Sequence, residues 1–195
     1  MSRTVALVAV FVLGALSACA APNLTQAPAA PLVPAWDDHP RGEVWTDAAL
    51  RALDTHASGL IEIVPDDVAS WCPAYEEADA ERRKAFWIAL VSVMSGHESG
   101  WRPAVSSPNG RWHGLMQISP ATAVGYGCQA TSAEALRTGP ANLACGLRII
   151  AATVARDGVV AAGGGGVAAD WGPFSRAKQR EHMRAFTRAQ PSCRS

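Results

Sequence analysis

Glu98 is the side chain in this 195-residue sequence whose surroundings best suit proton transfer. It follows Trp87, Val91 and Met94 at helical intervals, so the four side chains fall on one side of a helix. No Lys or Arg lies near Glu98 on that stripe. Burial without a cationic partner disfavours the charged carboxylate and raises its pKa, which suits a general acid working near neutral pH. Glu98 is therefore the candidate catalytic acid; the alternative is a helix-end Glu whose carboxylate lies in water.

The helix that carries Glu98 is expected to end directly after it. Gly100 follows two residues later and breaks the helix, and the dipole at a helix C-terminus also disfavours negative charge. A loop punctuated by Gly and Pro comes next, and the apolar segment 114–118 then returns toward the acid. The stretch 91–123 therefore forms the candidate active site.

Three blocks of this stretch resemble the motifs of a known family. They are Glu98-Ser99-Gly100, Ser106-Ser107, and Gly114-Leu115-Met116-Gln117 followed by Pro120, Thr122 and Ala123. In this order they resemble the ES, S and GLMQ-P-TA blocks of soluble lytic transglycosylase-like (SLT) domains of the lysozyme superfamily. The resemblance covers about residues 72–171, with one extra residue between Ser107 and Gly114. It implies a mainly α, lysozyme-like (goose-type lysozyme/SLT) helical domain with a single core.

The same resemblance implies a peptidoglycan lytic transglycosylase that cleaves the MurNAc–GlcNAc β-1,4 bond without a cofactor. Glu98 would protonate the leaving oxygen and then, as a base, activate the C6 hydroxyl of MurNAc, producing 1,6-anhydro ends. Ser99 and Gln117 would orient the acid and the N-acetyl group, and Met116 would line the cleft. Gly114, which lacks a Cβ, would let the backbone approach the sugar closely.

Further substrate contacts are expected from the loop after Glu98. Ser107 belongs to the middle block, and Trp101 and Trp112 are candidate platforms for stacking on sugar rings. A core position under the loop is the alternative for Trp101.

The sequence departs from the family at Asp170-Trp171, where an Ala-Tyr-Asn-x-Gly run usually places a tyrosine opposite the acid. Trp171 would stack on a sugar, Asp170 could act as a second carboxylate, and a turn with Trp171 buried in the core is the alternative for both. Two other functions stay open for the same reason. One is a hydrolytic lysozyme in which Asp170 holds the water, and the other is a non-catalytic wall-binding or scaffolding lipoprotein.

The N-terminus is typical of an exported lipoprotein. Residues 1–18 combine Arg3 with an apolar run too short to span a membrane, which indicates a signal peptide. Small residues before Cys19 resemble a lipobox, so Cys19 is the expected lipidation site; ordinary cleavage near Ala18 is the alternative. The Ala/Pro-rich residues 19–43 are expected to be a tether to a bacterial membrane, on its periplasmic side and in the outer membrane of a Gram-negative cell. Proteins of the cell-wall or secretion machinery are the protein partners that such an enzyme would meet.

Residues 44–195 are long enough for one domain, the predicted catalytic domain. The periodicity and capping residues predict helices over about 48–56, 79–98, 120–126, 132–136 and 140–155, an apolar connection over 60–64 and a short helix after Asp66-Asp67. Asn142 matches a further family motif and is expected to have a structural role as a helix cap. Gly163–Gly166 is expected to be a flexible loop without chemistry.

The charge balance gives no sign of a nucleic-acid partner. Seventeen Lys and Arg residues match 17 Asp and Glu residues, so the formal net charge is zero. The C-terminal region is locally basic, with Arg176, Lys178, Arg180, Arg184 and Arg188. We expect a solvated helix face there, because these residues do not gather on one stripe; contact with an anionic polymer or a membrane is the alternative.

Four cysteines remain beyond Cys19, and an even number in an oxidising compartment predicts disulfides. Three pairings are possible, and we favour Cys128 with Cys145 and Cys72 with Cys193. A zinc site is not expected, because no C-x-x-C pair or His ligand spacing is present.

Overall fold

The computed structural model describes residues 31–194. Within this range the chain forms seven α-helices and short 3-10 turns but no β-strand. The helices are α1 (Gly42–Asp54), α2 (Gly59–Glu62), α3 (Ala80–Ser99), α4 (Pro120–Gly125), α5 (Ala133–Leu136), α6 (Gly139–Asp157) and α7 (Ala177–Arg188). The 3-10 turns are η1 (Val68–Ser70), η2 (Ala162–Gly164), η3 (Gly166–Ala169), η4 (Gly172–Ser175) and η5 (Pro191–Cys193). The predicted signal peptide and Cys19 lie outside the described residues.

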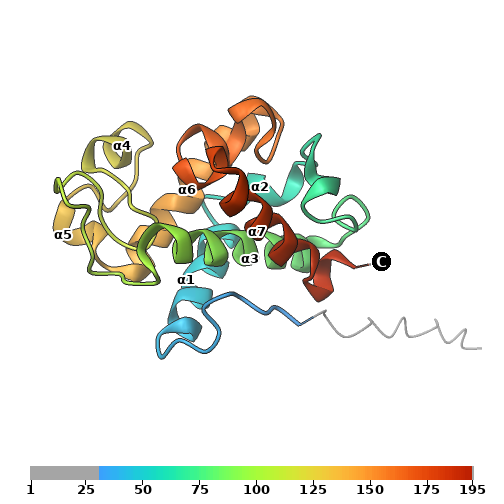
Figure 1. The fold of residues 1–195 in the computed structure, drawn as a ribbon, viewed down its shortest axis with the longest axis horizontal. Coiled ribbons are helices and arrows are strands. Elements are labelled where there is room, and N and C mark those ends of the chain that lie inside the picture. The colour runs from blue at the N-terminus through green and yellow to red at the C-terminus, as the bar shows by residue number, and fades with distance from the viewer. Residues whose placement is uncertain (1–30, 195) are drawn as a thin grey trace, which may run out of the picture.

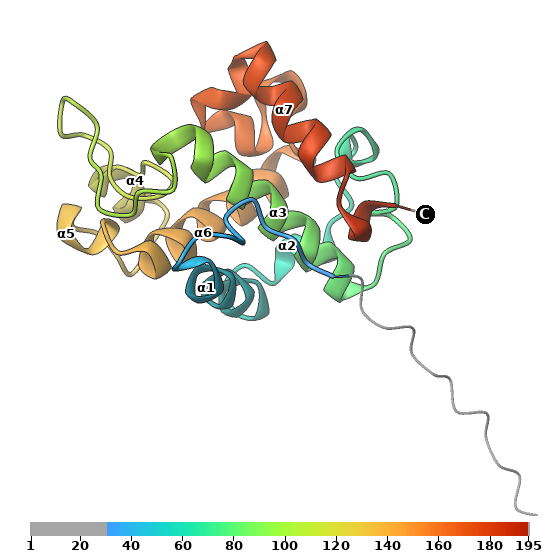
Figure 2. The same cartoon turned by 60° about the horizontal axis from the view of Figure 1, so that its bottom comes forward.

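Helix α3 is the centre of the domain, as its long apolar run predicts. Its N-terminus is capped by Asp79, whose carboxylate accepts the amide of Arg82 at 2.9 Å. All residues from Ala85 to Ser95 are buried, so this helix is enclosed on every side. Figures 1 and 2 show the reason: α7 covers one side of α3, and α1 and α6 cover the other. The end of α3 is therefore held in place by neighbours on both sides.

The first helix begins earlier than the sequence indicates. Local signals place its start after Thr46 and Asp47, but α1 already begins at Gly42. The reason is tertiary: Trp45 packs edge-on against Trp36, and the Trp36 Nε1 donates to the Thr46 hydroxyl at 3.0 Å. The expected connection 60–64 also differs, since its first part forms the one-turn helix α2.

The last part of the segment expected to be a tether packs against the domain. Pro34 and Trp36 are buried, and the amide of Ala35 donates to the Ser92 hydroxyl of α3 at 2.7 Å. The packed chain therefore extends back to about residue 34, because the indole of Trp36 fills a place in the core.

Helix α7 places its arginines differently from the expectation. Arg176 directly precedes the helix, and Arg180, Arg184 and Arg188 follow at intervals of four residues. Residues four apart lie on one ridge of a helix, so the expectation that the basic residues share no stripe was wrong. The face itself is solvated, since Arg176 and Arg188 are exposed and Arg180 and Arg184 are half-buried.

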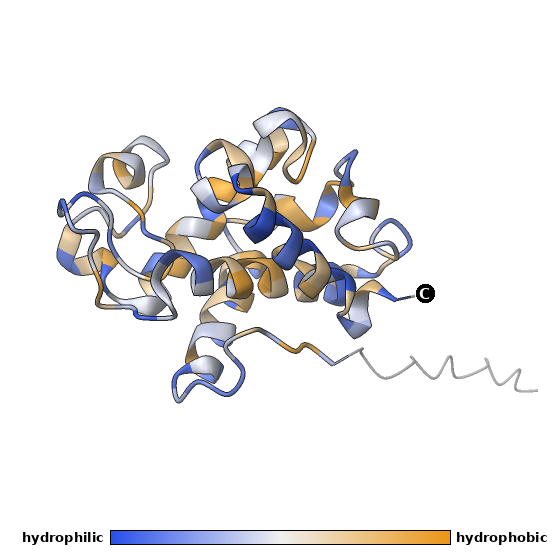
Figure 3. Ribbon diagram, viewed as in Figure 1, coloured by the Kyte–Doolittle hydropathy of each residue, from blue (hydrophilic) through white to orange (hydrophobic). Residues whose placement is uncertain are grey.

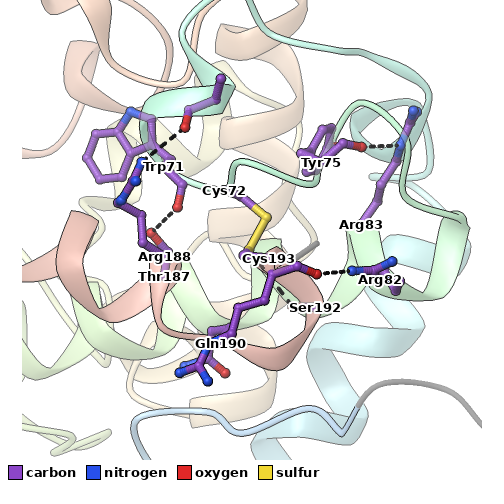
Figure 4. Close-up of a disulfide and its surroundings, with 12 residues drawn as sticks. Trp71, Cys72, Tyr75, Arg82, Arg83, Thr187, Arg188, Gln190, Ser192 and Cys193 are labelled. Carbon is purple, nitrogen blue, oxygen red and sulfur yellow. Dashed lines mark hydrogen bonds between the residues drawn. A yellow bond between two sulfur atoms is a disulfide. The ribbon is translucent and has the colours of Figure 1, made fainter.

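Two disulfides cross-link the domain: Cys72–Cys193 and Cys128–Cys145. These are the pairs favoured from the sequence. Figure 4 shows the first of them, with the hydroxyl of Thr187 donating to the carbonyl of Trp71 at 2.8 Å beside it. The C-terminal segment after α7 is thereby attached to the residues that precede α3.

No helix between residues 31 and 194 has the length and apolar content needed to cross a membrane.

Candidate active site

A cleft of about 310 Å³ opens where α3 ends. Its walls come from the end of α3, the segment between α3 and α4, and the turn between η3 and η4. The residues that line it are Glu98, Ser107, Trp112, Gln117, Asp170, Trp171 and Gly172. Six predicted site residues therefore meet here, all of the lining except Gly172, whereas Ser99, Trp101, Gly114 and Met116 do not line this cleft.

Glu98 is half-buried at the base of the cleft. Burial raises the pKa of Glu98 from 4.5 to about 7, and the positive charge of Arg176 acts in the opposite direction with a smaller effect. Sequence reasoning named Arg176 but did not connect it with Glu98, because its charge acts from the residue before α7 and not from the stripe of α3. A carboxyl group with a pKa near 7 can both donate and accept a proton at neutral pH.

Ser99 shapes the end of α3. Its buried hydroxyl donates to the carbonyl of Ser95 at 3.1 Å and accepts the amide of Arg102 at 3.3 Å. Gly100 and Trp101 follow with φ values of +61° and +55°, in the left-handed region that ends helices. Ser99 therefore holds the turn directly after Glu98.

Trp101 lies in a separate hollow beside His97 and Phe186. Its Nε1 donates to the carbonyl of Ser92 at 2.9 Å, and its ring packs against Gly96. This half-buried position corresponds to the alternative of a packed residue under the loop rather than to a stacking platform in the cleft.

The segment between α3 and α4 folds back on itself as a tight hairpin. His113 and Ile118 exchange both backbone hydrogen bonds at 3.0 Å. Gln117, at the turn, has a φ of +49°, and its Nε2 donates to the carbonyl of Gly114 at 2.9 Å. These bonds hold the Gln117 carboxamide at the edge of the cleft.

Ser107 organises the tip of the preceding loop. Its hydroxyl accepts the amides of Arg111 at 3.2 Å and Trp112 at 3.0 Å, and it donates to the Asn109 side chain at 2.8 Å. The Trp112 ring is 39% exposed and has the Arg111 guanidinium 5.0 Å from its centre. Ser107 thus positions Trp112, the more exposed of the two tryptophans that line the cleft.

Gly114 and Met116 lie beneath the cleft, held by Asn142 of α6. The Asn142 Oδ1 accepts the amide of Met116 at 2.8 Å, and its Nδ2 donates to the carbonyls of His113 and Leu136, both at 2.9 Å. A Cβ at Gly114 would collide with the Leu136 carbonyl and with Asn142. The missing side chain of Gly114 therefore makes room for the hairpin to pack against α5 and α6 rather than for a sugar. Asn142 has the expected structural role, although it bridges to the hairpin and does not cap its own helix.

Asp170 and Trp171 take different places. Trp171 is 4% exposed, and its Nε1 donates to the carbonyl of Met116 at 2.9 Å, so it supports the floor of the cleft. Asp170 is exposed on the rim, where its carboxylate accepts the hydroxyl of Tyr126 at 3.0 Å. Burial raises the pKa of Tyr126, and the hydrogen bond to the Asp170 carboxylate raises it further, with a smaller effect. Sequence reasoning missed Tyr126, because a tyrosine at the end of a short helix carries no signal of its own.

Within residues 31–194, no group of three His, Cys, Asp or Glu side chains is close enough to hold a metal ion.

Comparison with known proteins identifies the family. The sequence model of the family described as Transglycosylase SLT domain matches residues 76–179, more than half of the chain. The chain belongs to the SLT transglycosylase family. The matched part of this SLT domain contains all the residues that line the cleft. The predicted family is therefore confirmed.

Solved structures of Bd0314 DslA are similar to this SLT domain over most of its length. One variant with a Glu-to-Gln substitution is 28% identical with a TM-score of 0.76, and the wild-type form is 27% identical with a TM-score of 0.75. Each comparison covers 84% of this chain and 98% of the other. No curated protein matches the chain. Together with the family match, the structural similarity confirms the predicted mainly helical, lysozyme-like fold.

Proposed function

We propose that this SLT domain is a peptidoglycan lytic transglycosylase that cleaves the β-1,4 bond between MurNAc and GlcNAc. Glu98 is the single acid and base. It protonates the leaving glycosidic oxygen and then takes the proton of the MurNAc C6 hydroxyl as that oxygen bonds to C1. The product ends in 1,6-anhydro-MurNAc, and no water is consumed.

One observation carries this proposal: a half-buried carboxyl group with a pKa of about 7 lies in the cleft of an SLT domain. A group that acts first as an acid and then as a base works best when its pKa is close to the pH of the reaction. The same burial that raises the pKa also keeps the reacting atoms away from bulk water.

Three neighbours of Glu98 suit a sugar ligand. The Trp112 ring offers an apolar surface on which a sugar ring can stack. The Gln117 carboxamide is held by its Nε2, which leaves its oxygen to accept the N–H of an N-acetyl group. Asp170 lies on the rim and can accept sugar hydroxyls. These side chains would position the substrate, whereas Ser99, Gly114 and Met116 hold the backbone behind them.

The test is mass spectrometry of soluble fragments released from purified peptidoglycan by the chain without residues 1–19. We expect fragments with anhydro ends, and we expect none from Glu98→Gln. Binding of Glu98→Gln to the wall should persist, because glutamine has nearly the same shape. A folded wild-type protein that binds the wall but releases no fragments would instead favour the non-catalytic, wall-binding alternative.

A hydrolytic lysozyme is the second candidate, because Asp170 lines the same cleft as Glu98. In that reaction one carboxyl group protonates the leaving oxygen and the other holds the attacking water. If the wild-type protein releases fragments with reducing ends and Asp170→Asn releases none, the reaction is hydrolysis. Under the transglycosylase proposal, Asp170→Asn keeps the anhydro ends, since no water has to be activated.

We also propose that the chain is exported and lipid-anchored at Cys19, with residues 20–33 as the tether to the membrane. Two disulfides in the domain are consistent with an oxidising compartment. Mass spectrometry of the mature N-terminus tests this: a diacylglyceryl group on Cys19 is expected, and a soluble product in Cys19→Ser.

A further inference from the structure

A row of four arginines begins directly before helix α7 and continues along the helix. Arg176, Arg180, Arg184 and Arg188 are four residues apart, so successive members are about 6 Å apart along the helix. Arg176 is the residue whose charge acts on Glu98. We call these four residues the α7 arginine row. Figure 3 shows α7 as a strongly hydrophilic helix on the face turned to the viewer.

The middle of this row faces a hollow of about 360 Å³. Arg180 and Arg184 line it on one side, and the glycine-rich turn at Gly163 and Gly164 lines it on another. The segment 168–175 contributes residues both to this hollow and to the catalytic cleft. A ligand that extends from the cleft across this segment would therefore reach the row.

Both guanidinium groups in the hollow are held in place by protein contacts. The Nη1 of Arg180 donates to the carbonyl of Phe174 at 2.6 Å. The Arg184 guanidinium lies 5.0 Å from the centre of the Trp71 ring. Each guanidinium has five N–H donors, so these contacts orient the groups and leave donors for an anion.

The positive charge of the row is only weakly balanced. Asp67 also lines the hollow, but its carboxylate already accepts the amides of three successive residues, 160–162, at 2.5 to 3.0 Å. Among residues 31–194, only Arg184 of the row has a carboxylate within 4.0 Å, that of Glu181 at 3.0 Å. Exposed pairs of this kind contribute little energy and exchange readily for another anion. The guanidinium groups of the α7 arginine row therefore have donors available for another anion.

We propose that the α7 arginine row binds the carboxylates of the peptides that peptidoglycan carries on MurNAc. The inference rests on the proposed function, since the peptide reaches the row only when its MurNAc occupies the cleft. An extended chain advances about 3.4 Å per residue, so groups two residues apart are about 7 Å apart, close to the spacing of the row. Peptide-bearing glycan is then the preferred substrate, and bare glycan is the poorer one.

Steady-state cleavage of soluble glycan strands tests this, with one set bearing peptides and a matched set stripped of them by an amidase. In Arg180→Gln and in Arg184→Gln we expect the KM for peptide-bearing strands to rise roughly fivefold for each arginine. The kcat, and the KM for bare strands, should stay within twofold. The matched control is Lys178→Gln, which removes one exposed positive charge from the same helix but lies off the row.

The double variant Arg180→Lys/Arg184→Lys keeps both charges and should recover much of the affinity for peptide-bearing strands. If circular dichroism shows that a glutamine variant does not fold, the KM of this double variant for the two kinds of strand is compared with that of the wild type instead. Equal losses on both kinds of strand, or an equal loss in Lys178→Gln, would overturn the inference.

Failure of the proposed function looks different. A wild-type protein that cleaves neither strand contradicts the enzyme itself. A wild-type protein that cleaves both strands with the same KM leaves the enzyme intact and refutes only the role of the arginine row.

Discussion

At the scale of single residues, the burial of Glu98 costs stability. Its pKa is about 7 in the folded chain against 4.5 when exposed. As the pH rises above 4.5 the unfolded chain releases this proton first, so the folded state loses stability until the pH passes about 7. The difference between the two pKa values corresponds to a loss of up to about 3 kcal/mol in the free energy of unfolding.

Glu98→Gln, which carries no charge, should therefore raise the free energy of unfolding at pH 8 by up to about 3 kcal/mol. At pH 4 it should have little effect, because the wild-type carboxyl group is then neutral as well. Urea unfolding at the two pH values measures both quantities. An equal change in the free energy of unfolding at pH 4 and at pH 8 would mean that the Glu98 carboxylate is hydrated in the folded chain.

The cation beside the acid gives a second prediction at this scale. The positive charge of Arg176 lowers the pKa of Glu98, so Arg176→Gln should raise that pKa further. Under the proposed mechanism the first step needs protonated Glu98, so cleavage by the wild-type protein should decline above about pH 7. The declining limb should move to higher pH in the variant. The pH dependence of kcat/KM on bare glycan measures this without the peptide. A declining limb that moves to lower pH would contradict the electrostatic effect assigned to Arg176.

At the scale of elements, the hairpin that presents Gln117 depends on α6. Asn142 binds the backbone on both sides of Gly114, and Met116 packs into the space left by the missing side chain of Gly146. Short loops of this kind have few contacts of their own, so the helix behind them determines their position. The geometry of the cleft therefore depends on packing between α5, α6 and the hairpin.

Gly114→Ala tests this dependence. The new Cβ would meet the Leu136 carbonyl, and the φ of +81° also disfavours alanine, so we expect a loss of about 3 kcal/mol or more in unfolding free energy. Gly127→Ala is the matched control, with a φ of +66° and no atom within 4 Å of the new Cβ. Its loss should be about 1 kcal/mol. Similar losses in the two variants would show that the hairpin can shift away from α5 and α6.

At the scale of the whole molecule, the two disulfides close loops of very different length. Cys72 and Cys193 are separated by 121 positions and join the C-terminal segment to the residues before α3. Cys128 and Cys145 are separated by 17 positions and join α6 to the segment after α4. A longer loop restricts the unfolded chain more strongly.

Replacing Cys72 and Cys193 by alanine should lower the free energy of unfolding by about 4–5 kcal/mol. Replacing Cys128 and Cys145 should lower it by about 3 kcal/mol. Urea unfolding of the two double variants under non-reducing conditions gives the comparison. The reverse order would mean that local strain or residual structure outweighs loop length.

The sequence by itself determined the central helix, the position of Glu98 at its end and the family. The Asp79 cap, the apolar run of α3 and the break at Gly100 are local features, and a helix depends mainly on residues three or four positions apart. The ES and GLMQ blocks identified the family for a similar reason, because they form nearly continuous stretches of the chain.

Only the tertiary structure decided which residues of those blocks line the cleft. Ser99, Gly114 and Met116 lie in the motifs but turn to partners behind the cleft. Arg176 directly precedes α7, and its charge acts on Glu98 at the end of α3. The direction of a side chain depends on which distant element packs against it, and these contacts form only after the chain has folded. Local spacing therefore predicts which side chains share a face of a helix, but not which distant element packs against that face.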